Sequence, residues 1–264
     1  MTNSIAEVVD ADAIIVIGSN TTEAHPVIGA QIRQAVQRGA KLIVAEPREI
    51  PLVQDAHIFL KIKPGTNIAV INGLMHVIIS EGLYDKEYVE NRTEGFEELR
   101  EVVQHYTPER VAEICGIDAE DLKEAARLYA RADKSPIFYA MGVTQHSSGT
   151  AGVMSISNLA LLCGKVGKYG CGVNPLRGQN NVQGACDMGC LPGDYTGYQK
   201  VANPEARAKF ERAWGVSLPE KPGLTVTEAV KAIEEGRVRC LYIMGENPLL
   251  SDANLNHTEA AFKK

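Results

Sequence analysis

The first part of the chain alternates short apolar runs with segments of helical periodicity. Residues 13–18 (AIIVIG) are short and rich in β-branched side chains, as expected of a buried parallel strand. A helix follows from Pro26, with apolar side chains at helical spacing, and Gly39 ends it. Residues 41–47 (KLIVAEP) form a second predicted strand. Strand, helix and strand with short joints predict a right-handed βαβ unit with a parallel strand pair.

The same alternation continues further along the chain. A third strand is predicted at residues 57–62, followed by a turn and a capped helix over residues 64–82. Residues 85–132 are polar and periodic, which predicts four short amphipathic helices covering the sheet. Another strand at residues 135–142 and a helix over residues 149–164 extend the pattern.

The pattern changes over residues 164–197, which are rich in Gly, Asn, Gln and Pro and show no usable period. A long structured loop is expected there, and such loops in compact proteins are usually functional. Helices at residues 204–215 and 225–236 and a strand at residues 238–245 follow. We therefore expect an α/β fold: a Rossmann-like, mostly parallel sheet flanked by helices in residues 1–179, and an incomplete second α/β domain in residues 180–264.

Composition narrows the classes of function. A formal net charge of −6 gives no electrostatic reason to expect nucleic acid as a partner. No apolar run approaches the roughly 20 residues that span a bilayer, and the first residues lack a signal-peptide layout, so we expect a cytoplasmic protein without a membrane segment. Six cysteines are too dilute for a disulfide framework. Cys186 and Cys190 lie four residues apart, but without a CxxC pair no metal ligands are assigned.

Polar residues follow the first two predicted strands. In open α/β sheets, ligands gather beyond the carboxyl ends of the strands. Gly18 and Asn20 precede a helix whose free N–H groups could hold a phosphate, or Asn20 could cap that helix. Glu46 could accept hydrogen bonds from a ribose hydroxyl or a base edge. The glycine fingerprint of nicotinamide-binding folds is missing, and Glu46 with Arg48 could equally form a solvated surface pair.

Two later segments add candidate ligand groups. After the strand at residues 135–142, Gly142 permits close backbone approach and Gln145 offers a donor and an acceptor beside Met141, although an ordinary connecting loop has the same composition. His146 is interpreted as a surface histidine. Arg177 lies in a glycine-flanked loop, where its guanidinium offers a planar fork for a carboxylate or phosphate. Neighbouring amides can bind a polar heterocycle or simply form turns.

The segment around Arg177 is VNPLRGQNNVQGACDMG. It closely resembles the signature sequence of the catalytic subunits of molybdopterin-dependent formate dehydrogenases, in the dimethyl-sulfoxide-reductase superfamily. The resemblance extends through GSNTTEAHP, AEPRE, NRTEGFEELR, MGVTQHSSGT and YIMGENP, and so covers nearly the whole chain. It implies oxidation of formate to carbon dioxide, or the reverse, by a bis(molybdopterin guanine dinucleotide) cofactor with molybdenum or tungsten. Electrons would leave through iron–sulfur clusters of partner subunits.

The resemblance also implies roles for individual residues. Arg177 matches the arginine that orients formate beside the metal. The matched contacts to the guanine dinucleotide arm are Gly18, Asn20, Glu46, Arg48, Gly65, Asn67, Met141, Gly142, Gln145 and Gln179.

Some features of that family do not occur in this chain. The cysteine motif for a 4Fe–4S cluster, the relay lysine and the selenocysteine or cysteine that ligates the metal are missing. We therefore expect an internal piece of the catalytic subunit that works with the remaining domains of that subunit and is inactive alone. Two alternatives are another molybdopterin oxidoreductase of the nitrate reductase type and a non-catalytic nucleotide- or pterin-binding module.

Overall fold

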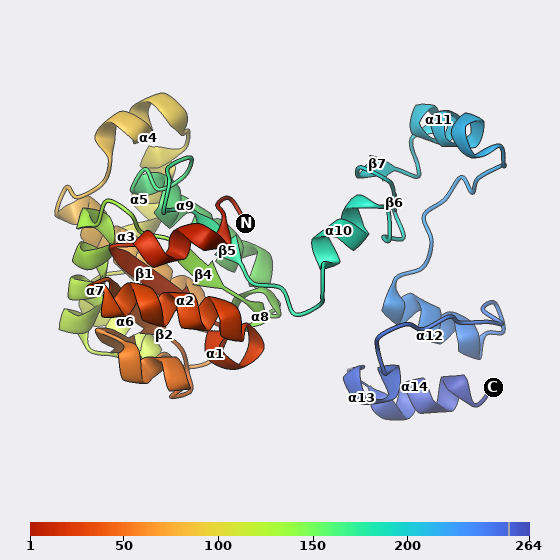
Figure 1. The fold of residues 1–264 in the computed structure, drawn as a ribbon, viewed down its shortest axis with the longest axis horizontal. Coiled ribbons are helices and arrows are strands. Elements are labelled where there is room, and N and C mark those ends of the chain that lie inside the picture. Colours follow the sequence, from red (N-terminus) through yellow and green to blue (C-terminus); the bar gives the residue numbers. More distant parts are fainter. Residues whose placement is uncertain (253) are drawn as a thin grey trace. The chain divides into compact units, whose positions relative to one another are not determined.

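The chain forms two units, Met1–Gly178 and Gln179–Lys264. The structure is a computed structural model, and it describes residues 1–252 and 254–264. Figure 1 shows the first unit as a sheet between helices, and the second as separate helices joined by extended chain. Every helix in these residues is too short or too polar to span a lipid bilayer.

A five-stranded parallel sheet is the centre of the first unit. Its strands are β1 (Ala13–Ile17), β2 (Lys41–Ala45), β3 (Ile58–Leu60), β4 (Ile137–Tyr139) and β5 (Val173–Pro175). They lie side by side in the order β3-β2-β1-β4-β5, and each neighbouring pair is parallel. This order places a topological switch point between β1 and β4, where the connections leave in opposite directions along the sheet. The predicted α/β class with a parallel sheet is confirmed.

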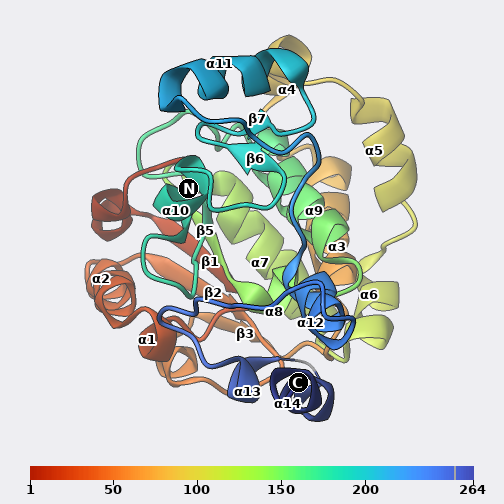
Figure 2. The same ribbon diagram turned by 90° about the vertical axis from the view of Figure 1, so that its right-hand side faces the viewer.

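Helices cover both faces of the sheet. One face is covered by η1 (Ile5–Asp10), α2 (Pro26–Gln37) and η2 (Pro51–Asp55), and the other chiefly by α3 (Asn67–Ser80), α7 (Ala119–Arg131) and α9 (Gly149–Leu162). In Figure 2, α2 lies on one side of the strands and α3, α7 and α9 on the other. The remaining helices are α1 (Thr21–Ala24), α4 (Lys86–Arg92), α5 (Phe96–Val103), α6 (Pro108–Cys115) and α8 (Met141–Thr144). The four helices predicted for residues 85–132 are therefore present as α4 to α7.

Strand β1 shows why the apolar runs are continuous. Ile14 and Val16 belong to the core on the α2 face, whereas Ile15 and Ile17 belong to the core on the α3 face. Because successive side chains of a strand point to opposite faces, a sheet covered on both sides needs an apolar residue at every position. All four side chains are at most 2% exposed. The absence of polar alternation is thus a direct consequence of the two cores.

The long loop predicted for residues 164–197 is wrong at three places, because the segment contains the edge strand β5, a helix at Val182–Asp187 and a short strand at Asp194–Tyr195. Only three residues pair with β4, and the last of them, Pro175, has no N–H group to donate. The backbone of Val173 is also hydrogen-bonded outside the sheet, because the Thr2 N–H donates to the Val173 carbonyl at 3.1 Å. Such a short strand ending in proline leaves little periodic signal in a sequence.

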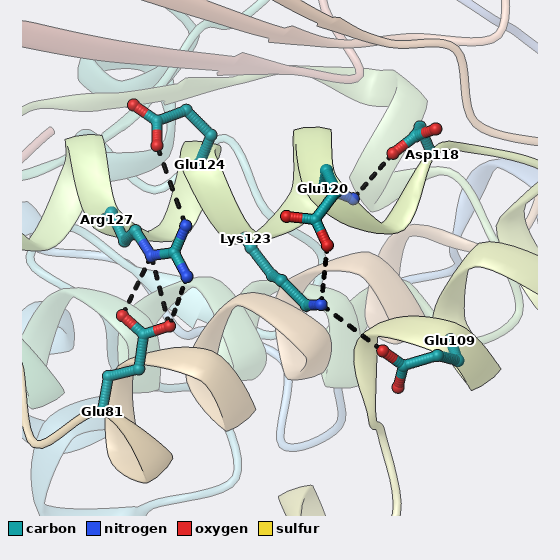
Figure 3. A network of polar contacts seen from close by, with 7 residues as sticks. All are labelled: Glu81, Glu109, Asp118, Glu120, Lys123, Glu124 and Arg127. Atoms are coloured by element: carbon teal, nitrogen blue, oxygen red, sulfur yellow. Dashed lines mark hydrogen bonds and ion pairs between the residues drawn. The ribbon is translucent and has the colours of Figure 1, made fainter.

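Ion pairs join the outer helices on the α3 face, as Figure 3 shows. Arg127 of α7 makes a bidentate pair with Glu81, which follows α3, with its closest N–O distance at 2.8 Å. Lys123, one turn earlier, contacts Glu120 on its own helix and Glu109 on α6. These charges are exposed or partly exposed, so water screens the pairs and each adds little to stability. The network helps to align the outer helices, while the core supplies most of the stability.

The second unit has a small core. Its helices are α10 (Val182–Asp187), α11 (Pro204–Trp214), α12 (Val226–Glu234), α13 (Pro248–Ser251) and α14 (Leu255–Phe262), and β6 (Asp194–Tyr195) pairs antiparallel with β7 (Gln199–Lys200). Tyr195 and Phe210 are buried together, with ring centroids 4.8 Å apart, and Trp214 packs against both rings. An aromatic cluster thus holds α11 against the β6–β7 hairpin.

The strand predicted at residues 238–245 does not form in this structure. The segment has no strand assignment, and Tyr242 and Met244 are 88% and 80% exposed. An extended segment becomes a strand only when a neighbouring strand accepts and donates its backbone hydrogen bonds. None of the described residues pairs with this segment, so the β-branched and aromatic run remains extended chain.

Candidate functional site

A pocket of about 350 Å³ opens at the carboxyl ends of the parallel strands in the first unit. It lies at the switch point between β1 and β4, where open α/β sheets bind ligands. The residues that line it are Gly18, Ser19, Asn20, Ala24, His25, Glu46, Pro47, Arg48, Ile62, Lys63, Pro64, Gly65, Asn67, Ala140, Met141, Gly142, His146 and Gly178. Eight of the ten predicted cofactor contacts are among them. The structure therefore brings together residues that are far apart in the sequence.

Two glycines meet beside the pocket. Gly18 ends β1 with φ +60°, and a Cβ atom at this position would lie 2.7 Å from the backbone of Gly142 after β4. The Gly142 N–H donates to the Gly18 carbonyl at 3.0 Å. Contacts this short exclude any side chain, and the positive φ independently favours glycine. The close approach expected at Gly142 is therefore present, and its partner is backbone.

Glu46 forms a buried acidic position at the end of β2. Its residue is 7% exposed, and burial raises the pKa of its carboxyl group. The charge of Arg48 and the backbone N–H groups of Ser19 and Arg48 oppose this effect on the pKa. Glu46 is thus a hydrogen-bond acceptor held at the pocket wall, and the alternative of a solvated surface pair does not fit its burial.

The third side of the pocket is formed by the segment between β3 and α3. Thr66 precedes the helix, but its hydroxyl donates to the Lys63 carbonyl at 2.7 Å and no side chain caps α3. The capping predicted here is therefore wrong. Asn67, only 8% exposed, donates from Nδ2 to the Gly142 carbonyl at 3.2 Å. The first N–H groups of α3 lack a side-chain acceptor, which suits an anion at this end of the helix.

Two histidines line the pocket that sequence reasoning did not select. His146 was interpreted as a surface residue and is indeed exposed, and it also lines the pocket with its Nε2 3.0 Å from the Gly142 carbonyl oxygen. His25 lies between α1 and α2, and its Nε2 contacts the carbonyl oxygen of Arg177. A clue to both was present in the sequence, because His25 lies eight residues after the end of β1 and His146 seven residues after the end of β4.

Three predicted residues, Gln145, Arg177 and Gln179, do not line this pocket. Asn20 lines it but makes no side-chain capping bond to α1. Gln145 ends α8 and is exposed, without lining the pocket. Arg177 follows β5, and its exposed side chain lowers the pKa of the Tyr139 hydroxyl, which burial raises more strongly. Gln179 belongs to the second unit.

The groups that line the pocket suit the diphosphate and base of a nucleotide. Arg48 and Lys63 supply positive charge, and the uncapped start of α3 supplies N–H donors. A Cβ atom at Gly65 would meet nothing within 4 Å, so the backbone there faces open space. Apolar side chains of Pro47, Ile62 and Met141 offer surfaces for a flat ring. Among the described residues, no group of three His, Cys, Asp or Glu side chains could hold a metal ion.

Comparisons with known proteins identify the family. The model of the molybdopterin oxidoreductase family matches residues 1–264. The chain is 50% identical over its full length to a formate dehydrogenase subunit alpha from Methanocaldococcus jannaschii, of which it covers 39%. It is 48% identical to formate dehydrogenase H from Escherichia coli, again over its full length and 37% of that protein.

A solved structure shows the same fold. Acetylene hydratase from Pelobacter acetylenicus superposes with a TM-score of 0.58 at 36% sequence identity, covering 64% of this chain and 23% of the hydratase. The chain spans about two fifths of the length of the two formate dehydrogenase relatives named above. The chain belongs to the molybdopterin oxidoreductase family.

Proposed function

We propose that the first unit binds the guanine dinucleotide arm of a molybdopterin cofactor, and that a polypeptide containing this chain oxidises formate. The observation that carries the proposal is the pocket at the switch point, which gathers Gly18, Glu46 and Gly142 in a chain 50% identical to a formate dehydrogenase subunit. When bound, the cofactor takes up the two electrons that leave formate. Their further path through iron–sulfur clusters of partner subunits is part of the same proposal.

The pocket residues have separate roles in this proposal. Arg48, Lys63 and the start of α3 bind the diphosphate, whose charge their N–H groups complement. Glu46 accepts hydrogen bonds from the guanine edge or the ribose, because a buried carboxylate oxygen needs donors. Gln145 and Gln179 extend the contacts beyond the pocket.

Arg177 is proposed to orient formate. A guanidinium is always charged and binds a carboxylate through two parallel hydrogen bonds, which fixes the direction of the formate C–H bond. Arg177 follows β5 with its side chain exposed, next to the pocket residue Gly178. A conservative Lys cannot reproduce the two-pronged contact.

Fold alone does not decide between formate and another substrate. The acetylene hydratase carries the same fold under a name that describes hydration, so the site must make the distinction. The higher identities to proteins named formate dehydrogenase favour formate over that alternative.

Calorimetric titration of the chain with guanosine diphosphate tests the cofactor proposal. We expect binding that is lost in Arg48→Ala and kept in Arg38→Ala, an exposed arginine outside the pocket. Equal binding of adenosine and cytidine diphosphates would remove the assigned role of Glu46 in base recognition. Unchanged binding in Arg48→Ala would contradict the site.

Formate-dependent dye reduction tests the substrate role. The 264-residue chain alone is expected to show none. In the longest polypeptide that contains the chain, Arg177→Lys should lower kcat/KM for formate at least about a hundredfold. The matched change Arg212→Lys on α11, in the second unit, should leave it unchanged. Full activity of Arg177→Lys would exclude Arg177 as the formate ligand.

A further inference from the structure

An imidazole joins two distant segments at the rim of the pocket. His25, at the junction of α1 and α2, contacts the carbonyl oxygen of Arg177 through Nε2, although the two residues are 152 positions apart. A carbonyl oxygen accepts hydrogen bonds, so the imidazole must donate from Nε2. The segment after β1 is thereby tied to the segment after β5.

The surroundings of the other ring nitrogen, Nδ1, indicate which tautomer of the His25 imidazole fits. Nδ1 of His25 is buried and has no hydrogen-bond partner among the described residues. A hydrogen on Nδ1 would be an enclosed donor without an acceptor, which is more costly than an enclosed lone pair. The geometry therefore fits the tautomer that carries its hydrogen on Nε2, as the contact with Arg177 requires.

The backbone on both sides of Arg177 is also held. The Leu176 N–H donates to the Tyr139 carbonyl at 2.7 Å, which continues the β4–β5 ladder. On the other side, a Cβ atom at Gly178 would lie 2.6 Å from Cε of Met141, so the glycine backbone packs under that methionine. Between these two contacts, His25 is the group that fixes the peptide carbonyl of Arg177 itself.

We propose that His25 is a positioning residue for Arg177. By holding the Arg177 carbonyl, it fixes the peptide plane and with it the direction in which the arginine side chain leaves the end of β5. The importance of this direction for formate rests on the proposed function, whereas the contact itself does not. A residue that touches neither substrate nor cofactor would then control how well the carboxylate is oriented.

Limited trypsin digestion of the chain tests the positioning directly. Trypsin cleaves after Arg177 only when this segment opens, so the cleavage rate follows the population of the open form. His25→Leu removes the donor and keeps an apolar side chain, and should speed cleavage after Arg177 about fivefold, the loss of one neutral hydrogen bond. His25→Gln places an amide N–H near the position of Nε2 and should restore the slow rate.

Controls separate this local effect from unfolding. His105→Leu removes an exposed imidazole that follows α5 and should not change cleavage after Arg177. Cleavage after Lys41, inside β2, reports unfolding of the whole unit and should stay slow in all variants. An unchanged Arg177 rate in His25→Leu, or a His25→Gln variant as fast as His25→Leu, would overturn the proposal.

Steady-state kinetics test whether the position of Arg177 affects formate oxidation. In the longest polypeptide that contains the chain, His25→Leu should raise the KM for formate several-fold more than it lowers kcat, and His25→Gln should reverse the change. Faster cleavage together with an unchanged KM would overturn the effect of His25 on formate while its hold on the Arg177 backbone stands. Full activity of Arg177→Lys, by contrast, would reject the substrate role alone. The two failures are therefore distinguishable.

Discussion

The two units contain apolar runs of the same kind in very different surroundings. Residues of β1 in the first unit are at most 2% exposed, whereas Ile243 and Met244 in the second unit are 43% and 80% exposed. Strand β1 has β2 on one side and β4 on the other. The apolar run at residues 238–245 has no neighbouring strand among the described residues. A β-prone sequence thus becomes a strand only when adjacent strands satisfy its backbone.

Cysteine reactivity should show the largest difference between the units. Burial raises the pKa of Cys163 in the first unit to about 12, whereas Cys240 in the second unit is exposed. Because the thiolate is the reactive form, Cys240 should react at least about a thousandfold faster with a thiol reagent at pH 8. Mass spectrometry of the labelled native chain measures both rates. Comparable rates would contradict the burial of Cys163.

Truncation of one isoleucine in each unit should differ by several kcal/mol. Ile14→Ala leaves a cavity in a fully buried core position and should cost about 4 kcal/mol. Ile243→Ala removes an exposed side chain and should cost less than about 0.5 kcal/mol. Urea unfolding followed by circular dichroism reports mainly the first unit, while the fluorescence of Trp214, the single tryptophan, reports the second. Equal shifts would show that the two runs are equally buried.

The glycine contact gives the next largest effect. Gly18→Ala combines a positive φ with a clash against the backbone of Gly142, and should destabilise the first unit by about 3 kcal/mol. Gly215→Ala in the second unit has a similar φ of +69° but no atom within 4 Å, and should cost only about 1 kcal/mol. Urea unfolding measures both. Similar costs would mean that the strand ends can separate.

Replacing the carboxyl group of Glu46 and that of Glu81 should change the melting temperature at pH 7 in opposite directions. Burial raises the pKa of Glu46, so its stabilising contribution is present below about pH 4.5 and is lost as the pH rises through the folded value. Glu46→Gln should therefore raise the melting temperature at pH 7, and this gain should vanish in acid. The hydrogen bond from Arg127 lowers the pKa of Glu81, so Glu81→Gln should lower the melting temperature at pH 7 and lose this effect in acid. Shifts of the same sign would refute the assignment.

The sequence was sufficient for most of the first unit because its elements carry strong local signals. Strand β1 and residues 42–45 of β2 are continuous apolar runs, and α2 begins at a proline and stops shortly before a glycine. The edge strand β5 was missed because three residues ending in Pro175 give no period and depend on Thr2 and β4 for their hydrogen bonds. The strand expected at residues 238–245 was wrong for the related reason that pairing partners are not encoded locally.

The site was predictable to the extent that it follows strand ends. Glycines and polar residues after β1, β2 and β4 were expected to meet because parallel strands end at the same edge. The role of His25 could not be predicted, because its partner carbonyl belongs to a residue with no sequence signal for backbone contacts. The burial of Glu46 likewise depends on packing that a pattern of residue types does not describe.

The strand order also has a consequence for how the first unit folds. Ile15 of β1 pairs with Ile43 on one side and with Ile137 on the other, so the second partner becomes available only after a long helical stretch has been synthesised. Until then, the free edge of β1 exposes unpaired amides in a very apolar strand, which is a state prone to aggregation. We expect pulse-labelling hydrogen exchange to protect the β1–β2 amides before those of β4.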